Sequence, residues 1–249
     1  MATFLKKTAI LVDGGFYRRR AQILWGEKTA EERAAELYDY CIKHLYHKRE
    51  DRELYRIFYY DCPPAEKRIY HPLLKKTVDL KKTDIFTWSN VFLDELKNKR
   101  KVAVRLGELA ENQAQYLLND SAVKKLCRGE LKVEDLKEKD FFFDITQKGV
   151  DMRIGLDIAS MAYKKQVNQI ILISGDSDFV PAAKLARREG IDFILDPMKF
   201  SIRDNLSEHV DGIESKVALI SSNDDSTANI KQSDELIGQA ISLAKTDNK

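Results

Sequence analysis

Short apolar runs that stop at an acidic residue or a glycine constrain this chain more than any other feature. The runs lie at residues 8–12, 54–60, 101–109, 169–174 and 191–195. The first stops at Asp13-Gly14-Gly15 and the second at Asp61. Runs of this length, rich in branched and aromatic residues and bounded by turn residues, are typical of buried strands in a parallel sheet.

Segments with apolar residues at helical spacing alternate with these runs. They lie at residues 30–46, 71–98 (two helices), 151–165 and 179–189. Strands that alternate with helices predict an α/β fold with a central, mostly parallel sheet of five or six strands. Residues 111–136 are charged, locally helical and fit no strand or helix of this pattern. A polar linker follows residue 220, and residues 235–244 are expected to form a short helix.

Composition excludes several classes of protein. Of 249 residues, 43% are hydrophobic and 33% are charged, which is typical of a globular domain and excludes a disordered or collagenous chain. No apolar stretch is long enough to span a membrane, and the N-terminus does not resemble a secretory signal. The three cysteines are too few and too widely spaced for a disulfide framework, so we expect a cytoplasmic protein.

Charge is balanced over the whole chain but not along it. The net charge is +2. Between Cys41 and Arg105 there are 16 Lys and Arg against 9 Asp and Glu, so a basic surface that attracts a polyanion is possible there. A solvated lysine-rich helix explains the same excess equally well.

Acidic residues gather at one predicted edge of the sheet. Ligands bind at the carboxyl ends of the strands in an open parallel sheet, and Asp13, Asp176 and Asp178 follow two such ends. Asp151 begins a helix that must start on the same side. Four carboxylates this close repel one another unless they are neutralised, and oxygen ligands suit Mg²⁺ or Mn²⁺. We therefore expect a divalent metal site formed by Asp13, Asp151, Asp176 and Asp178.

Each acid also has a simpler explanation. Asp after a strand is common in turns, and Asp before a helix is a common N-cap, which alone explains Asp151 or Asp178. We interpret Asp61, which precedes two prolines, as a turn residue. Asp157 is either a residue that supports the metal ligands from behind or an ion-pair partner of Arg153 or Lys164.

Other chemistries find little support. His44 and His47 lie three residues apart in a lysine-rich segment, and no further cluster of His or Cys appears in the sequence, which argues against a second metal site. The chain has no phosphate-binding glycine loop and no Gly-x-Ser-x-Gly nucleophile elbow. Cys62 is expected to be a small buried residue and not a nucleophile.

Three motifs together resemble the NYN domain, in the LabA-like branch of the PIN-like nuclease superfamily. They are Ile-Leu-Val-Asp-Gly-Gly-Phe at 10–16, Lys-Gly-Val-Asp at 148–151 and Ile-Ser-Gly-Asp-Ser-Asp-Phe-Val-Pro at 173–181. The resemblance covers residues 6–217. It implies a PIN-like three-layer α/β/α sandwich and a metal-dependent endoribonuclease that leaves 5′-phosphate and 3′-hydroxyl ends.

The resemblance also assigns roles to residues. Asp13, Asp151, Asp176 and Asp178 match the acids that hold the metal, Mg²⁺ or Mn²⁺, and carry catalysis. Asp157 falls where many members also have an Asp, so it is a further candidate ligand. The small polar residue near the phosphate corresponds to Ser174. One departure is that many members have Asn soon after the first Asp-Gly, where this chain has Phe16 and Tyr17.

Substrate contacts and partners follow from the same resemblance. Lys148, Arg18, Arg19 and also Arg20 are candidates to bind the phosphate backbone of RNA, either single-stranded or structured, with single-stranded DNA left open. We expect one domain at residues 1–220 with a charged helical insertion around 111–140, followed by the linker and helix of 221–249. The insertion or the last helix is a candidate contact for a homo-oligomer or a protein partner.

Three alternatives stay open. One is a non-catalytic or partner-activated regulator of the same fold that binds RNA or protein. Another is a phosphatase or phosphotransferase, although a haloacid dehalogenase-like enzyme needs Asp-x-Asp at the first strand and a Toprim site needs Glu there. The third is an effector that docks through residues 235–244.

Overall fold

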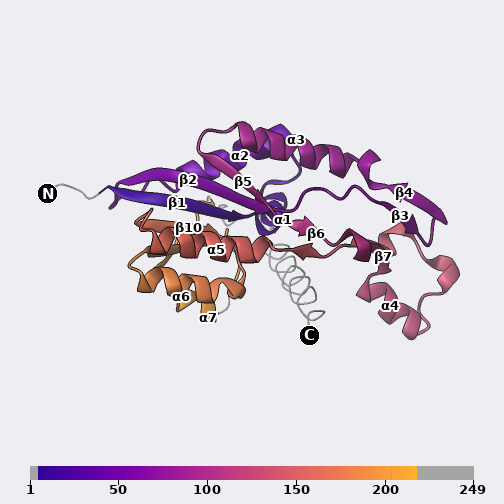
Figure 1. The fold of residues 1–249 in the computed structure, drawn as a ribbon. Coiled ribbons are helices and arrows are strands. Elements are labelled where there is room, and N and C mark those ends of the chain that lie inside the picture. Colours follow the sequence, from indigo (N-terminus) through magenta and orange to yellow (C-terminus); the bar gives the residue numbers. More distant parts are fainter. Residues whose placement is uncertain (1–4, 203, 218–249) are drawn as a thin grey trace, which may run out of the picture. The chain divides into compact units, whose positions relative to one another are not determined.

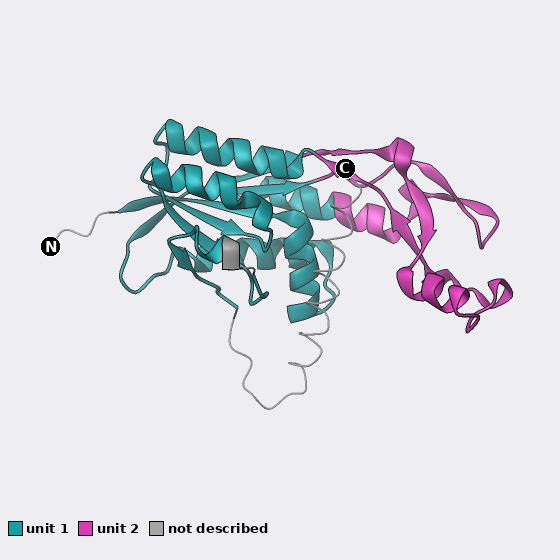
Figure 2. Cartoon of the chain, turned by 90° about the horizontal axis from the view of Figure 1, so that it is seen from below, with its two compact units in different colours: residues 1–61, 91–106, 149–249 teal, residues 62–90, 107–148 magenta. Residues whose placement is uncertain are grey.

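Six parallel strands form the centre of the molecule's larger compact unit. The computed structural model describes residues 5–202 and 204–217. Unit 1 takes in residues 1–61, 91–106 and 149–249, and unit 2 takes in 62–90 and 107–148 (Figure 2). The strands of unit 1 are β1 (Lys6–Asp13), β2 (Arg52–Asp61), β5 (Val102–Leu106), β10 (Gln169–Ile173), β11 (Asp192–Asp196) and β12 (Gly212–Ile213). Their order in the sheet is β12-β11-β10-β1-β2-β5, which confirms the predicted α/β class and the predicted sheet.

Helices cover both faces of this sheet and complete a three-layer sandwich. Figure 1 shows α2 and α3 on one face and α5 and α6 on the other. The helices are α1 (Gly14–Trp25), α2 (Ala30–Lys43), α3 (Asp84–Asn98, which begins in unit 2), α5 (Val150–Tyr163), α6 (Val180–Arg188) and α7 (Asp204–Ser207). Thr29 and Glu32 form a capping box that starts α2, and this explains why the predicted helix begins at residue 30. No helix in the described ranges combines the length and hydropathy that a bilayer crossing requires.

The chain changes direction across the sheet between β1 and β10. It runs outward from β1 through β2 to β5 and then returns to β10, on the other side of β1. Such a switch point opens a crevice at the carboxyl ends of the two neighbouring strands, because the connections leave them in opposite directions. The fold therefore favours a ligand site where β1 and β10 end.

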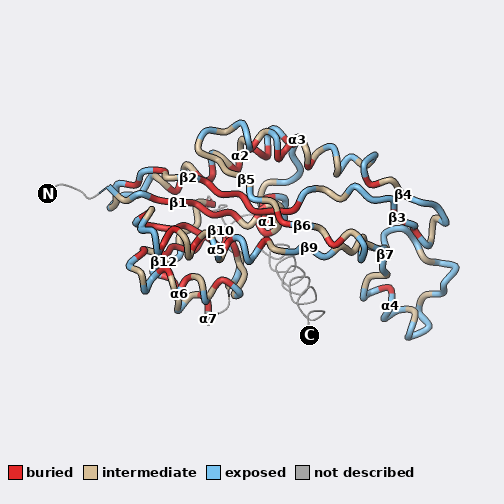
Figure 3. The backbone as a smooth tube through the Cα atoms, viewed as in Figure 1, coloured by how far each residue is buried: buried red, intermediate tan, exposed pale blue. Residues whose placement is uncertain are grey.

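The middle strands of the sheet bury mainly apolar side chains. Ile10, Leu11, Ile171 and Leu172 have no exposed surface, and Figure 3 shows the central strands as the most continuously buried part of unit 1. Each such side chain contributes roughly 2 kcal/mol by its removal from water. Burial of this apolar core provides the favourable free energy that offsets the cost of burying charged groups at the strand ends.

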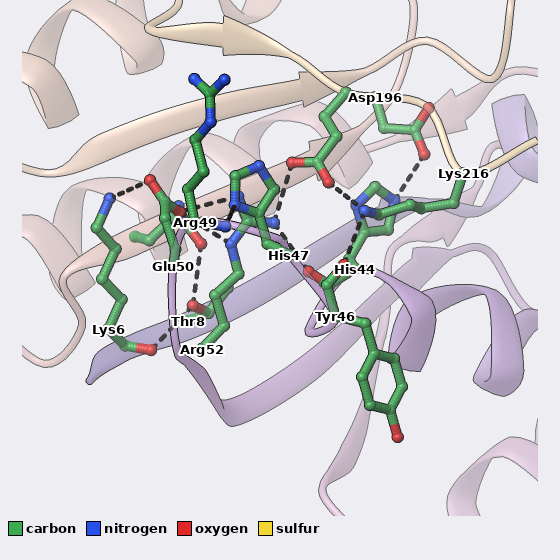
Figure 4. A network of polar contacts seen from close by, with 12 residues as sticks. Lys6, Thr8, His44, Tyr46, His47, Arg49, Glu50, Arg52, Asp196 and Lys216 are labelled. Carbon is green, nitrogen blue, oxygen red and sulfur yellow. Dashed lines mark hydrogen bonds and ion pairs between the residues drawn. The ribbon is translucent and has the colours of Figure 1, made fainter. Parts of the chain in front are cut away.

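A network of ion pairs ties the amino ends of the strands together (Figure 4). Lys6 Nζ donates to Glu50 Oε1 at 2.7 Å and to Asp192 Oδ2 at 2.8 Å. Arg52 donates to Glu50 at 3.0 Å and to the carbonyl of His44 at 2.8 Å. Burial alone would raise the pKa of Glu50, but hydrogen bonds from these cations and from Gln169 lower it to about 2. The acids at this edge are neutralised by fixed partners.

Unit 2 is built from short antiparallel ribbons. Its elements are β3 (Arg68–His71), β4 (Lys76–Asp79), β6 (Glu108–Leu109), β7 (Gln115–Leu118), α4 (Asp120–Cys127), β8 (Phe141–Asp144) and β9 (Gln147–Lys148), with single turns at Leu80–Lys82, Glu111–Gln113, Val133–Asp135 and Glu138–Asp140. The pairs are β3–β4, β6–β9 and β7–β8. The buried ring of His71 lies 4.3 Å from the ring of Tyr116 and 5.3 Å from that of Phe141, measured between centroids. The predicted insertion at 111–140 lies within this unit, which also includes residues 62–90.

Part of the predicted secondary structure is wrong. Of the two helices expected over residues 71–98, only α3 exists, because Ile69 and His71 are buried while Tyr70 is exposed, which is the alternation of a strand. Pro72 then blocks helix formation and a tight turn leads into β4. Helix α1 was not among the predicted helices, although its buried residues Phe16, Tyr17, Arg20 and Ala21 have helical spacing. The predicted linker and helix of 221–249 lie outside the described residues.

The start of α1 gives a first prediction. A Cβ atom at Gly14 would lie 2.5 Å from Tyr59 Oη and 2.6 Å from the carbonyl oxygen of Tyr60. We expect Gly14→Ala to lower the free energy of unfolding by about 1–3 kcal/mol, because backbone and a fully buried tyrosine must shift. Urea denaturation measures this change.

The neighbouring glycine is the matched control. A Cβ atom at Gly15 would meet only Asp13 Oδ1 at 3.6 Å, an ordinary contact. Gly15→Ala should therefore leave stability nearly unchanged. Equal stability of the two variants would contradict the close approach at Gly14.

Candidate active site

Asp13 ends β1 and caps the helix that follows. Its Oδ1 accepts a hydrogen bond from the backbone N–H of Phe16 at 3.1 Å, and its Oδ2 accepts one from the hydroxyl of Ser174 at 3.1 Å. An N-cap carboxylate is also stabilised by the positive end of the helix dipole. The two contacts fix the Asp13 carboxylate at the switch point of the sheet.

The surroundings of Asp13 disfavour its charge. Burial, the largest cause, raises the pKa of Asp13 to about 6, and the negative charge of Asp151 adds to this effect. The N–H of Phe16, the charge of Arg19 and the Ser174 hydroxyl lower the pKa but do not offset the rise. A proton on this carboxyl group, or a cation close to it, would remove the energetic cost of its buried negative charge.

Ser174 joins Asp13 to the acids that follow β10. Ser174 is fully buried, and the oxygen of its hydroxyl accepts a hydrogen bond from the N–H of Asp176 at 3.2 Å. Asp176 caps the short turn η5 (Ser177–Phe179) by accepting from the N–H of Asp178 at 2.9 Å. The chain is close to its neighbours here, since a Cβ atom at Gly175 would lie 2.8 Å from the ring of Phe16. The first and third motifs are therefore in direct contact.

Asp151 reaches the same edge from the first turn of α5. Gly149, which precedes the helix, has φ of +78°, a conformation that favours glycine. Asp151 and Asp178 line one groove of about 380 Å³ between α5 and α6, here called the α5–α6 groove. Its other lining residues are Met152, Gly155, Ala159, Phe179, Pro181, Ala182 and Leu185. Contacts, charge and a shared groove thus bring the four predicted acids to one edge of unit 1.

This arrangement was compared with known proteins. The family model of the NYN domain matches residues 67–211, more than half of the chain. The chain belongs to the NYN domain family. The family lies within the PIN-like nuclease superfamily, and its members are typically ribonucleases. The match includes the second and third motifs but not β1, so Asp13 is connected to it through the Ser174 hydrogen bond.

Comparisons with curated proteins and with solved structures identify no function for the chain. No curated protein matches this chain. Among solved structures, a protein of unknown function from Vibrio parahaemolyticus RIMD 2210633 is 14% identical, with 89% of this chain and 94% of that chain covered and a TM-score of 0.42.

The described residues of the site do not form a complete set of metal ligands by themselves. Within residues 5–202 and 204–217, no three His, Cys, Asp or Glu side chains stand close enough together to hold an ion. Mg²⁺ often takes only one or two carboxylates and completes its shell with water and substrate phosphates. Asp13 and Asp151, whose charges already act on one another, form a donor set of that size.

Asp157 has two defined partners in this NYN domain. Its Oδ2 accepts from Tyr60 Oη at 2.8 Å and from Arg105 Nε at 3.3 Å. The expected ion pair with Arg153 or Lys164 is replaced by this contact with β5. Asp157 therefore connects α5 to β2 and β5, on the face of the sheet that α5 covers.

The three consecutive arginines of α1 have different environments. Arg18 pairs with Asp61 at 3.0 Å, and Arg19 is exposed and close enough to influence Asp13. Arg20 is fully buried, donates to the carbonyl of Met198 at 2.9 Å and lies over the ring of Phe200. Arg20 is therefore a core residue, and its predicted role in binding substrate is wrong.

The remaining predicted contact comes from unit 2. Lys148 ends β9 and is exposed. It directly precedes Gly149, the residue at which the chain enters unit 1.

Two acids that end other strands were missed. Asp61 is 2% exposed and accepts from Tyr59 Oη at 2.8 Å, in addition to its pair with Arg18. Asp196 is fully buried, with Tyr40 Oη at 2.5 Å and His44 Nε2 at 2.8 Å from its Oδ2. Both acids lie at the end of a strand, which is the sequence signal that could have identified them. The interpretation of Asp61 as a turn residue alone was therefore incomplete.

The raised pKa of Asp13 predicts how stability depends on pH. The unfolded chain releases the Asp13 proton near pH 3.8, whereas the folded chain keeps it to about pH 6. Stability contributed by this group is therefore lost as pH rises through that window, by an amount on the order of 1–3 kcal/mol. In Asp13→Asn this loss is absent, so the stability of the variant relative to wild type should grow between pH 4 and pH 7.

Urea denaturation at several pH values measures the difference. The control is Asp94→Asn, which removes an exposed acid of α3 that pairs with Lys97. It should show no such trend. A difference between Asp13→Asn and wild type that stays constant with pH would contradict the raised pKa.

Proposed function

We propose that this NYN domain is a metal-dependent endoribonuclease of the LabA-like branch, with its site where β1 and β10 end. The single observation that carries the proposal is the hydrogen-bonded link Asp13–Ser174–Asp176 at the switch point, with the charge of Asp151 acting on Asp13. Nuclease sites need fixed carboxylates that a cation neutralises while the phosphate is bound. The family membership supports the same reaction class.

The proposed ion is Mg²⁺ or Mn²⁺. The proposed ligands are carboxylates, whose oxygen atoms suit either ion. Such an ion supplies a Lewis acid for the scissile phosphate and lowers the pKa of water. Asp13 and Asp151 are the proposed first ligands, because binding of a cation would relieve the burial and repulsion that raise the pKa of Asp13.

The other residues have distinct proposed roles. Asp176 and Asp178 orient the incoming water and phosphate, or complete the ligand set when substrate is bound. Ser174 is a positioning residue, because its hydroxyl is used by Asp13 and by the Asp176 N–H. Asp157 supports the site indirectly, because its contacts with Tyr60 and Arg105 hold α5, the helix that carries Asp151, in place. Arg18, Arg19 and Lys148 contact the phosphate backbone.

The alternative is a non-catalytic or partner-activated protein of the same fold that binds RNA. The observation in its favour is that the described side chains form no group of three metal-ligating residues. In that case metal and cleavage would appear only with a partner, or not at all.

Cleavage of labelled RNA tests the proposal. The substrates are single-stranded RNA, hairpin RNA and single-stranded DNA, each with Mn²⁺, Mg²⁺ or EDTA. We expect metal-dependent cutting of RNA that falls by roughly 100-fold or more in Asp13→Asn and in Asp176→Asn, because a catalytic ion contributes several kcal/mol. Asp94→Asn is the control and should cut like wild type. Cutting that survives both site substitutions would reject this site, and no cutting by wild type would favour the alternative.

The arginines of α1 provide a second test. Arg19→Ala should weaken RNA binding and reduce the slope of log affinity against log salt by about one, as expected for one lost phosphate contact. The protein should unfold at the same temperature as wild type, since Arg19 is exposed. Arg20→Ala should instead lower the unfolding temperature, because it leaves the Met198 carbonyl and the Phe200 ring without their partner. Binding titrations at several salt concentrations and thermal unfolding separate the two roles, and a reversed result would contradict them.

A further inference from the structure

A turn that follows β11 has a backbone conformation that its residues do not favour. Met198 has φ of +46° and Lys199 has φ of +61°, and the N–H of Phe200 donates to the carbonyl of Pro197 at 2.7 Å. Positive φ at both central residues is typical of a type I′ turn, which usually contains Asn and Gly. The left-handed region is unfavourable for residues with a Cβ atom, so other contacts must hold this segment, here called the 197–200 turn.

Buried polar side chains hold the 197–200 turn in place. Asp196 Oδ1 accepts from the N–H of Met198 at 2.7 Å, and Arg20 Nη2 donates to the carbonyl of Met198 at 2.9 Å. Asp196 and Arg20 have no exposed surface. The other carboxylate oxygen of Asp196 accepts from Tyr40 Oη of α2 at 2.5 Å. Side chains of α1 and α2 therefore fix the turn, either directly or through Asp196.

The turn places the ring of Phe200 against Gly175. The rings of Phe200 and Phe16 meet edge to face, with centroids 5.9 Å apart and planes at 80°. A Cβ atom at Gly175 would lie 2.8 Å from an atom of each ring, so both rings lie against the backbone of Gly175. The guanidinium of Arg20 lies 5.5 Å from the centroid of the Phe200 ring. The two aromatic rings thus restrict the movement of the Gly175 backbone.

Gly175 lies inside the hydrogen-bonded link that joins Asp13 to Asp176. The N–H of Ser174, before the glycine, donates to the carbonyl of Asp196 at 3.2 Å. The N–H of Asp176, after the glycine, donates to the hydroxyl oxygen of Ser174 at 3.2 Å. Glycine has more backbone freedom than any other residue, and rotation at Gly175 would break the second of these bonds. Rings packed against Gly175 remove that freedom.

We propose that Phe200 is a positioning residue for the acids that follow β10. Together with Phe16 it clamps Gly175, and the strained 197–200 turn holds its ring in that place. The clamp keeps the Asp176 N–H on the Ser174 hydroxyl, and with it the placing of the Asp176 carboxylate. Rigid support of this kind keeps the groups of a site in the geometry that a reaction needs. The effect on cleavage rests on the proposed nuclease function, whereas the clamp itself does not.

Amide hydrogen exchange in Phe200→Ala tests the clamp. We expect the N–H of Asp176 to exchange roughly 10-fold faster than in wild type, because the Gly175 backbone opens locally once one ring is removed. The N–H of Leu172, inside β10, reports the stability of the sheet and should change less. NMR of the full chain without added metal measures both rates. If Leu172 accelerates as much as Asp176, or if Asp176 keeps its wild-type rate, Phe200 only packs the core and the proposal is overturned.

Two further variants show whether the effect belongs to this ring. Phe200→Tyr keeps the ring and should keep the Asp176 exchange rate close to that of wild type. Phe143→Ala is the matched control, since it removes another half-buried phenylalanine, whose ring lies 5.6 Å from that of Tyr116 in unit 2. It should leave exchange at Asp176 unchanged. Acceleration in either variant equal to that in Phe200→Ala would count against a clamp formed by the Phe200 ring.

Cleavage kinetics test what the clamp does for the proposed nuclease. With Mn²⁺ or Mg²⁺, Phe200→Ala should lower kcat roughly 10-fold and leave KM within about 2-fold, because Phe200 acts on the placing of the acids and not on RNA. Phe200→Tyr should restore most of kcat. An unchanged kcat beside faster exchange at Asp176 would overturn the positioning role. A wild type that cuts no RNA would reject the proposed function, and the exchange rates would still decide whether Phe200 clamps Gly175.

Discussion

The hydrogen bond between Ser174 and Asp13 holds together the part of the molecule on which everything else at the site depends. It crosses the switch point between β1 and β10, where the connections that follow these two neighbouring strands run in opposite directions across the sheet. Asp13 at the same time starts α1, and Ser174 accepts the N–H that positions Asp176. One buried contact therefore sets the start of a helix and the placing of two acids. Fixed groups of this kind lower the reorganisation needed when charge develops in a reaction.

Two acids at opposite edges of the sheet, Glu50 and Asp13, have pKa values shifted in opposite directions. At the amino edge, Glu50 is also partly desolvated, yet Lys6, Arg52 and Gln169 hold its pKa at about 2. At the carboxyl edge, Asp13 has a pKa of about 6 in spite of a helix N-terminus and a nearby arginine. A purely structural acid is expected to have fixed cationic partners, as Glu50 has in Lys6 and Arg52. A buried carboxylate with a raised pKa is expected where a bound cation and a phosphate complete the site.

Much of this site can be predicted from sequence because its acids follow apolar runs that end abruptly. Asp13, Asp176 and Asp178 stand directly after strands, and the sheet brings strand ends together whatever the intervening chain does. Partners were not predictable in the same way. Nothing near Asp157 in sequence indicates Tyr60 or Arg105, and nothing near Asp61 indicates that Arg18 neutralises it. The β3–β4 hairpin was mistaken for a helix because its leucines lie in the turn, where periodicity carries no information.

Unit 2 consists of two segments that interrupt the chain of unit 1. The chain leaves unit 1 after β2 and returns at Val91, within α3. It leaves again after β5 and returns at Gly149, directly before α5. Both departures follow the carboxyl ends of strands, and such connections commonly carry the binding residues of α/β proteins. The four acids all belong to unit 1. The contact between Asp13 and Ser174 therefore lies within unit 1 and involves no residue of unit 2.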